Sequence, residues 1–567
     1  MKMITISKKP VKNVYEEDEK KTKSRNGFYF LYIRTHRSFA LLLTKLYRFF
    51  LNEPSVKNNN NINNNINNNT YQINESFEKI PFYVAILAYI GFYVLLFLGY
   101  LNQFLFPPVV AKEKNREGYP ALFDKFETFY WNYVFRRIRD GWERPICGVA
   151  GAEVMLKDRV THDKGWTFQF TGTETKYLNL GSYNYLGFAQ ADGICSKHSV
   201  ETIEKYGCAT GSTRKEVGTV TLHRELEELT ARFLGVEDAI IFGMGFATNA
   251  LNLASIMSPD CLVMSDEKNH ASLILGLKLS GATVRIYKHN DMKSLENNLV
   301  DGLRKGQPGT KKPWRKLFIV TEGIFSMEGS IVKLPPLLAI KQKYKAYVYL
   351  DEAHSIGALG SRGRGVIDYY GCDPKQVDIL MGTFTKSFGS AGGYIAGSKS
   401  LIDHLRIHGD AEYYASSMPP PVGQQIYSSM KIIMGEDGTN DGQKRIKRLA
   451  RNTQYFRRRL QQMGCIVYGN DDSPVVPMLV YMYSKVTAVV RLYADYNIAT
   501  VGVGFPATAL MECRIRFCLS AGHTLKQLRR VLDITETIAD EVGFRYSRRI
   551  PLRDIGVFES DDDEDAR

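Results

Sequence analysis

The clearest chemical signal in the sequence is a lysine flanked by hydroxyl side chains. The segment Gly382–Gly389 reads GTFTKSFG and places Lys386 shortly after the apolar run Ile379–Met381. A lysine that binds an aldehyde cofactor as a Schiff base needs nearby hydroxyls and backbone N–H groups to hold a phosphate. By itself, an octet of this kind is more often an ordinary glycine-rich turn after a strand.

A second chemical group precedes the lysine by 35 residues. Asp351, Glu352 and His354 follow the apolar run Tyr347–Leu350. The carboxyl ends of parallel strands meet at one edge of a sheet, so we expect Asp351 and Lys386 to face one crevice. A carboxylate there can bond to a pyridinium nitrogen and keep the ring electron-accepting. The rival interpretation, a helicase acidic box, is weak because no G-x-x-x-x-G-K-[ST] motif is present.

The elements that must position these residues alternate between short apolar runs and helical stretches. This alternation predicts an α/β domain over residues 166–440, in which helices cover both faces of a mainly parallel sheet. The predicted strands are Ala239–Phe242, Cys261–Ser265, Val284–Tyr287, Leu317–Thr321, Tyr347–Asp351 and Ile379–Thr383.

The pattern changes near Asp441 and predicts a smaller α+β domain over residues 441–560. The acidic residues 561–567 are expected to form a solvated tail. The predicted elements of this domain are a basic helix from Asp441 through Arg457, strands near Val475–Met482 and Cys513–Leu519, and a closing helix from Thr524 to Gly543.

A long apolar segment precedes both domains. No charged side chain occurs over residues 81–111, and about 20 apolar residues are enough to cross a hydrocarbon core. We therefore predict one transmembrane helix over residues 80–106, followed by a linker and N-terminal segment over 107–165. Residues 1–79 contain an asparagine tract and are expected to be disordered, with either an interfacial or a plain surface helix over Phe39–Phe50.

The charges that flank the apolar segment predict its orientation. The upstream side carries only Lys79, so the positive-inside rule puts the C-terminal side in the cytosol. Two sequons, at Asn68 and Asn74, offer a check on the tail, although an asparagine-rich tract also makes sequons by chance. The downstream basic residues are Lys112, Lys114, Arg116 and Lys125.

Composition limits the remaining function classes. The formal net charge is +14, but the basic residues are dispersed, which favours a membrane surface or an anionic substrate and argues against a nucleic-acid partner. The eight cysteines form no C-x-x-C pair and no disulfide pattern, so we expect a reduced, cytosol-facing domain. The sequence gives no signal for a metal site.

Several motifs in order resemble the α-oxoamine synthases, a family of fold-type-I enzymes that use pyridoxal phosphate (PLP). These enzymes join an amino acid to an acyl-CoA with loss of the amino-acid carboxylate. The resemblance extends from about Arg144 to about Gly543. The motifs that carry it are the octet around Lys386, Asp351 with His354, and the segments Tyr177–Gly187, Gly207–Arg214, Glu322–Gly329 and Arg516–Thr524.

The resemblance implies a role for each matching residue. Lys386 would bind the cofactor and move the substrate proton, Asp351 would bond to the ring nitrogen, and His270 would stack on the ring. Without the other motifs, His270 would be read as a satisfied core histidine. The remaining implied contacts are His354 with the ring's phenolic oxygen, Gly245 and Phe246 with the phosphate through their backbone, Thr383 and Thr385 with the phosphate through their hydroxyls, and Arg516 with the substrate carboxylate.

The match to the family is less direct at the strand arginine and at the residue after Thr508. Arg514 lies two residues from Arg516 on the same strand face, and we favour Arg516 because its spacing to His523 matches the family. The family loop at Gly504–Thr508 usually continues with proline, whereas Ala509 stands here. This departure affects loop stiffness and acyl-chain selectivity more than chemistry, since proline mainly restricts the backbone.

Within the family, the sequence is most similar to the membrane-anchored members that condense serine with palmitoyl-CoA in sphingolipid synthesis. The resemblance implies a heterodimer with a related subunit that lacks the lysine, although a homodimer also fits the sequence. It further implies a single-pass protein of the endoplasmic reticulum membrane. The alternatives are a synthase of the same family that uses glycine or alanine, and a non-catalytic membrane scaffold, against which the intact Lys386 argues.

Overall fold

The computed structural model describes residues 75–106, 118–119 and 125–549. The predictions for the asparagine-rich tail, the helix over Phe39–Phe50, the two sequons and the acidic tail lie outside the described residues. The same holds for most of the linker that follows the apolar segment.

The largest sheet of the described residues has seven strands in the order β4-β10-β9-β8-β7-β5-β6. Its strands pair in parallel except β10, which is antiparallel to both β4 and β9. The predicted mainly parallel sheet is therefore confirmed, whereas β10 was not predicted because its sequence, GYIAG, is short and glycine-rich. The strands are β4 (Asp238–Phe242), β5 (Cys261–Asp266), β6 (Thr283–Tyr287), β7 (Lys316–Glu322), β8 (Tyr347–Asp351), β9 (Ile379–Thr383) and β10 (Gly393–Gly397).

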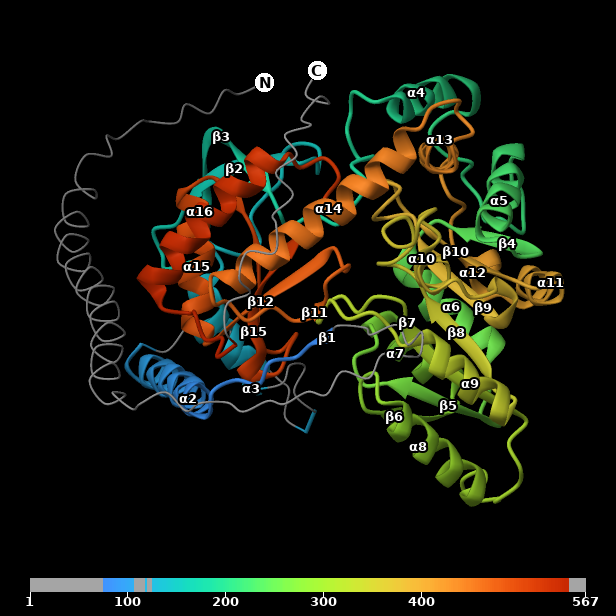
Figure 1. The fold of residues 1–567 in the computed structure, drawn as a ribbon, viewed down its shortest axis with the longest axis horizontal. Helices are drawn as coiled ribbons and strands as arrows, with labels where there is room; N and C mark the ends of the chain where they lie inside the picture. The colour runs from blue at the N-terminus through green and yellow to red at the C-terminus, as the bar shows by residue number, and fades with distance from the viewer. Residues whose placement is uncertain (1–74, 107–117, 120–124, 550–567) are drawn as a thin grey trace, which may run out of the picture. The chain divides into compact units, whose positions relative to one another are not determined.

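Alternate side chains of these strands enter two different cores, because successive residues of a strand point to opposite faces. Along β7, Ile319 belongs to one buried cluster, and Phe318 and Val320 belong to the other. Helices cover both faces (Figure 1), as buried parallel strands require. These helices are α4 (Ile194–Tyr206), α5 (Thr221–Leu234), α6 (Gly245–Ile256), α7 (Ala271–Ser280), α8 (Met292–Lys305), α9 (Leu334–Tyr344), α10 (Gly365–Tyr370), α11 (Lys399–His408), α12 (Asp410–Tyr414) and α13 (Pro420–Met434).

Two three-stranded sheets lie outside the large one. One has the order β12-β15-β14, and the other, β13-β3-β2, pairs Leu178 with Ile498 across a long stretch of sequence. The predicted domain boundaries at residues 165 and 440 stay a prediction. The strand β3 lies after the first boundary, and it pairs with β2, before that boundary, and with β13, after the second. The elements are β2 (Glu153–Val160), β3 (Gln169–Asn179), α14 (Asp441–Gln462), β12 (Val475–Tyr481), α15 (Tyr483–Asp495), β13 (Ile498–Ala499), β14 (Val501–Val503), β15 (Cys513–Cys518) and α16 (Leu525–Val542).

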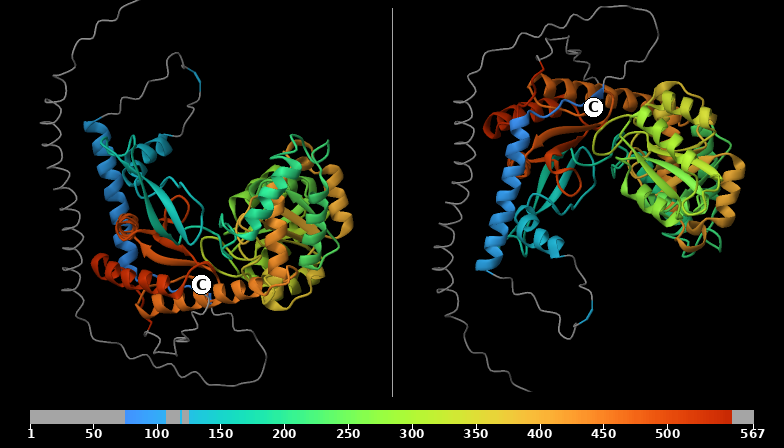
Figure 2. Two further views of the ribbon diagram at one scale, coloured as in Figure 1. Left: turned by 90° about the horizontal axis from the view of Figure 1, so that it is seen from above. Right: turned by 90° about the horizontal axis from the view of Figure 1, so that it is seen from below.

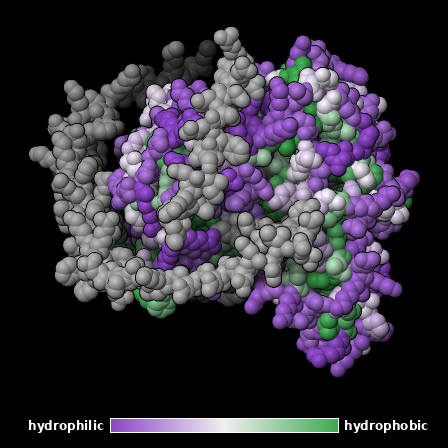
Figure 3. All heavy atoms as spheres, viewed as in Figure 1, coloured by the Kyte–Doolittle hydropathy of each residue, from purple (hydrophilic) through white to green (hydrophobic). Residues whose placement is uncertain are grey.

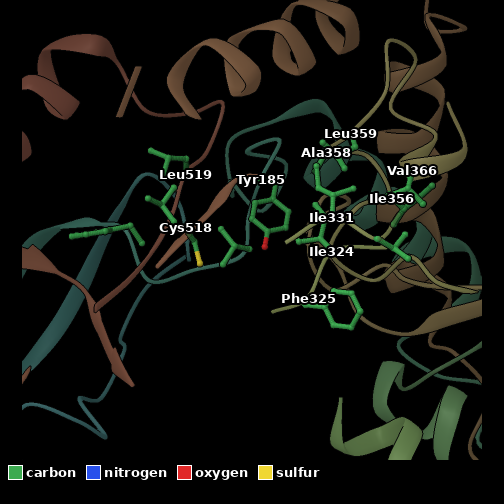
Figure 4. Packing of buried hydrophobic residues seen from close by; sticks show 14 of the residues in the cluster. Tyr185, Ile324, Phe325, Ile331, Ile356, Ala358, Leu359, Val366, Cys518 and Leu519 are labelled. Atoms are coloured by element: carbon green, nitrogen blue, oxygen red, sulfur yellow. The ribbon is translucent and has the colours of Figure 1, made fainter. Parts of the chain in front are cut away.

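One buried cluster continues from β15 into the loops at the carboxyl edge of the large sheet. Figure 4 shows Tyr185 between Cys518 and Leu519 on one side and Ile324 and Ile331 on the other. All five residues belong to the same core cluster. This shared core fixes the strand that carries Arg516 against the strand ends that carry the other candidate residues.

The apolar segment forms the helix α2 (Phe82–Leu105), which is long and apolar enough to cross a membrane. One face packs against the following segment: a Cβ at Gly99 would lie 2.8 Å from the Phe129 ring, and Tyr100 stacks on that ring at 3.9 Å. Figure 2 shows α2, in blue, beside this part of the chain. The neighbouring elements are β1 (Glu75–Ser76), which pairs with β11 (Gly469–Asn470), and the short helices α3 (Lys125–Phe129), η1 (Tyr130–Val134) and η2 (Phe135–Ile138).

The outer face of α2 is strongly apolar. Phe82, Phe97 and Phe104 are 79%, 65% and 83% exposed. Elsewhere the surface that faces the viewer is mainly hydrophilic (Figure 3). A contiguous apolar surface of this kind needs a partner, and a lipid bilayer is the one that suits an uncharged helix of 24 residues.

Candidate active site

Lys386 lies just beyond the end of β9, in the position that the sequence predicts. Its Nζ is 3.4 Å from the Thr383 Oγ1 and 5.9 Å from the centre of the Tyr183 ring. Burial lowers the pKa of the lysine, against the opposing effect of the Asp351 carboxylate. A lysine with a lowered pKa supplies more of the neutral amine, which is the nucleophilic and basic form.

Asp351 ends β8, the strand beside β9, and is 3% exposed. Its Oδ2 accepts a hydrogen bond from the Asn249 side-chain amide at 2.8 Å, and its Oδ1 accepts one from the Ala353 N–H at 2.9 Å. The Asn249 carbonyl oxygen in turn accepts a bond from the Tyr349 hydroxyl at 2.7 Å. Donors on both oxygens hold the carboxylate in one orientation, which suits a fixed bond to a ring nitrogen.

His354 is buried three residues further on, and its Nδ1 is 2.7 Å from the Tyr185 hydroxyl. Burial holds the pKa of His354 well below its usual value, and the positive charge of Lys386 lowers it further. The imidazole is therefore neutral at physiological pH, with one nitrogen fixed by Tyr185 and the other able to bond a cofactor oxygen.

His270 caps the N-terminus of α7, with its Nδ1 2.8 Å from the Ser272 Oγ. The Glu322 carboxyl accepts a hydrogen bond from the backbone N–H of His270. The Phe246 ring meets the imidazole edge-on at 6.0 Å. Burial lowers the pKa of His270, so its ring is available as a neutral surface on which a cofactor can stack.

The phosphate-side residues gather at the start of α6. A Cβ on Gly245 would lie 3.0 Å from the Thr383 Cγ2 and 3.2 Å from the Gly392 carbonyl oxygen, so the helix can begin this close to β9 only because the residue is glycine. The Thr385 hydroxyl donates to the Thr383 Oγ1 at 3.1 Å. Two hydroxyls beside the free N–H groups of a helix N-terminus form a suitable cradle for a phosphate.

Arg516 and Arg514 both lie on β15, but their partners differ. Arg514 is fully buried and donates to the Met327 carbonyl oxygen at 2.8 Å and to the carboxylate of Glu512 at 2.9 Å. Arg516 donates to the Ser326 Oγ at 3.1 Å, and its buried Nε has no hydrogen-bond partner among the described residues. The Arg516 guanidinium is thus the one with a donor to spare for a substrate carboxylate.

The structure brings the predicted residues to one edge of the large sheet. Lys386, Asp351 and His270 interact electrostatically, and Arg516 reaches the same group from β15. Sequence reasoning did not single out the residues that support them. The supporting residues are Asn249, Glu322, Tyr183, Tyr185 and Ser326. Most of them lie within the family motifs. Glu322 could also have been found from its position at the end of a strand, as Asp351 was.

Comparisons with known proteins agree with this geometry. The family model for class I and II aminotransferases matches residues 175–534. Serine palmitoyltransferase 3 of Homo sapiens is 49% identical over 86% of this chain and 91% of its own length. Serine palmitoyltransferase 2 of Caenorhabditis elegans is 51% identical over 84% of this chain and 86% of its own. The chain belongs to the serine palmitoyltransferase family.

Solved structures of serine palmitoyltransferases share the fold. The enzyme of Sphingomonas wittichii superposes with a TM-score of 0.65 at 23% identity, covering 74% of this chain and 98% of that one. A structure described as containing PLP as an internal aldimine gives a TM-score of 0.64 at 25% identity, covering 74% of this chain and all of that one. The family resemblance inferred from the motifs is thereby confirmed.

Proposed function

We propose that this protein is the lysine-bearing catalytic subunit of a serine palmitoyltransferase. It condenses L-serine with palmitoyl-CoA, releasing CO2 and CoA and forming 3-ketosphinganine, the first step of sphingolipid synthesis. The observation that carries the proposal is the position of Lys386 among Asp351, His354 and His270, beside the unpaired donor of Arg516. The names of the most similar relatives support the same reaction.

The residues of the site fit PLP. The Gly245 position is a cradle that a Cβ would fill, and the two threonine hydroxyls can bind the phosphate. Lys386 would hold the cofactor covalently, while Asp351 would bond to its ring nitrogen. His354 would bond to its phenolic oxygen. When bound, PLP supplies an electron-accepting ring that stabilises negative charge at the amino-acid Cα.

The side chains of this protein then perform three tasks. Arg516 binds the serine carboxylate, which fixes the bond to be broken relative to the cofactor plane. The Lys386 amine takes the Cα proton, and burial, by lowering its pKa, favours the neutral form that can accept this proton. His270 would stack on the cofactor and so help to orient it relative to Arg516.

The visible absorption of the purified protein, supplied with PLP, tests the proposal. We expect a band that borohydride removes, that shifts with L-serine, and that is absent from Lys386→Ala. Turnover of serine with palmitoyl-CoA should also be abolished in that variant, because no other described amine lies at the end of β9. Glycine and alanine serve as matched substrates, and a larger response to either would move the protein to another synthase reaction.

Two results would contradict the proposal. If the wild-type protein, purified with any partner subunit and supplied with PLP, gives no band, then the fold serves as a scaffold and the mechanism is wrong. Normal turnover in Lys386→Ala would likewise contradict the role of the lysine.

We also propose the assembly and the location. The family resemblance favours a heterodimer with a related subunit that lacks the lysine, and the mass of the purified complex distinguishes this from a homodimer. The apolar face of α2 supports anchoring in a membrane, which for sphingolipid synthesis is that of the endoplasmic reticulum. Fluorescence co-localisation with a marker of that organelle checks this assignment.

A further inference from the structure

Three residues outside the predicted site form a chain of hydrogen bonds in the order Asp–His–Ser. The His289 Nδ1 is 2.9 Å from the Asp266 Oδ1, and its Nε2 is 2.7 Å from the Ser330 Oγ. Asp266 ends β5, His289 follows β6, and Ser330 follows β7. The three residues therefore join the ends of three neighbouring strands, beside the turn that carries His270.

The same order of groups activates the nucleophile of serine hydrolases, but the surroundings here exclude that chemistry. Ser330 is fully buried and adjoins the fully buried Ile331. The Phe325 ring packs edge-on against the imidazole of His289, with its centre 4.4 Å away. Figure 4 shows Phe325 and Ile331 within the packed core. A substrate carbonyl has no path to the Ser330 hydroxyl.

Asp266 instead organises the turn between β5 and α7. Besides His289, its carboxylate accepts hydrogen bonds from the backbone N–H of Lys268 at 2.9 Å and from that of Asn290 at 3.0 Å. An aspartate 3% exposed with this many donors is held in one orientation. Lys268 lies two residues before His270, the N-cap of α7. The orientation of Asp266 therefore fixes the position from which His270 caps the helix.

Two further contacts fix the same turn. Asn269 donates from its side-chain amide to the Val320 carbonyl oxygen of β7 at 2.9 Å. Lys268 forms ion pairs with Glu328 at 3.3 Å and with Glu512 at 3.5 Å. The turn is thus attached to the large sheet on one side and to the segment that leads into β15 on the other.

We propose that His289 is a positioning residue for the active site, which acts by fixing Asp266 and, through the turn 266–270, the imidazole of His270. This inference rests on the proposed function of His270 as the residue that stacks on the cofactor. In this arrangement, the His289 Nδ1–H donates a hydrogen bond to the Asp266 carboxylate, and Nε2 accepts a hydrogen bond from the Ser330 hydroxyl. Nothing is transferred to substrate.

The test compares substitutions that remove different bonds. His289→Ala removes both bonds, whereas His289→Asn keeps an amide N–H near the place of Nδ1. Ser330→Ala removes only the outer bond and is the matched control. Each variant is purified from the full chain with its partner, and its bound PLP is measured by absorbance. The visible circular dichroism of that PLP then reports how asymmetrically the surrounding side chains hold it.

We expect His289→Ala to retain the lysine-bound absorbance but to lose most of the visible dichroism and about 100-fold in kcat, as a displacement of about 1 Å at a reacting group does. His289→Asn should recover much of both, and Ser330→Ala should resemble wild type. Palmitoyl-CoA hydrolysis without serine should be unchanged in Ser330→Ala.

Unchanged dichroism and kcat in His289→Ala would overturn the inference, while a wild-type protein without the absorbance band would overturn the proposed function instead. If His289→Ala does not fold, Asp266→Asn decides the matter, since it leaves the core volume nearly unchanged and should lose the dichroism and kcat in the same way. Loss of palmitoyl-CoA hydrolysis in Ser330→Ala would favour a nucleophilic serine and contradict a positioning role.

Discussion

At the scale of single residues, hydrogen-bond saturation decides which side chains are available for chemistry. Arg514 and Arg516 share one strand face, yet the Arg514 guanidinium is occupied by Met327 and Glu512, whereas Arg516 keeps a buried donor without a partner. A buried donor left unpaired is costly, so such a group is typical of a position that a ligand completes.

The two arginines should therefore fail in different ways. Arg516→Ala should lower kcat/KM for serine by about 10- to 100-fold, because a hydrogen bond to a charged group contributes about 1.5–3 kcal/mol. Arg514→Ala should instead lower the free energy of unfolding by about 2–5 kcal/mol, since it leaves a cavity in place of a fully buried side chain and removes its bonds to Met327 and Glu512. Steady-state kinetics and denaturant unfolding of both variants check this, and the reverse pattern would exchange the two roles.

Glu322 gives a prediction about pH. Burial and the neighbouring Asp351 hold the pKa of Glu322 well above its usual value. The folded chain therefore keeps a proton that the unfolded chain releases above about pH 4.3, and the free energy of unfolding falls as pH rises through that window. Glu322→Gln cannot ionise, and its amide oxygen can still accept the N–H of His270.

We expect Glu322→Gln to keep substantial activity and to gain stability relative to wild type as pH rises from about 5 to about 8. Thermal unfolding of both proteins across that range measures the difference. A stability difference between the two proteins that does not change with pH would contradict a raised pKa at Glu322. Loss of activity in the Gln variant alone would show that the carboxyl itself is needed.

At the scale of elements, the composition of α2 does not decide whether the helix spans the membrane. The helix is apolar enough to span a bilayer, yet its N-terminal flank is attached to the catalytic part of the chain. The Glu78 carboxylate accepts bonds from the Ser547 hydroxyl at 2.8 Å and from the Arg548 N–H at 2.7 Å. A spanning helix with a lumenal N-terminal side must break these bonds.

The two sequons test the orientation directly. If α2 spans with its C-terminal side in the cytosol, Asn68 or Asn74 should be glycosylated in microsomes, and a mass shift sensitive to endoglycosidase should disappear in the double Asn→Gln variant. An engineered sequon upstream, further from the helix, controls for poor access. Absence of glycan at all three sites would contradict a lumenal N-terminal side and would agree with the contacts of Glu78.

At the scale of the whole molecule, the site depends on two separate sheets. The seven-stranded sheet carries Lys386, Asp351 and Glu322 at its carboxyl edge, while β15 of a smaller sheet carries Arg516. The buried cluster around Tyr185 joins the two sets. In the proposed mechanism, substrate selection and cofactor binding are thus divided between two sheets. The ion pairs of Lys268 link the turn before α7 to the segment that leads into β15.

The sequence by itself determined where six strands of the large sheet lie in the chain, together with the lysine octet. Tyr347–Asp351 and Ile379–Thr383 were predicted with the bounds that the structure has, because buried parallel strands read as short apolar runs. The α/β class, the apolar helix and the family motifs could all be read from the sequence in the same way. Each of these signals is carried by residues close together in the chain.

Only the tertiary structure decided the remaining features. The pairing of β3 with β13, the antiparallel β10, and the saturation of Arg514 all depend on contacts between distant segments. The chain of Asp266, His289 and Ser330 is of the same kind. Such contacts depend on how strands pack against one another, and a local pattern of polar and apolar residues does not encode which distant polar group becomes a partner.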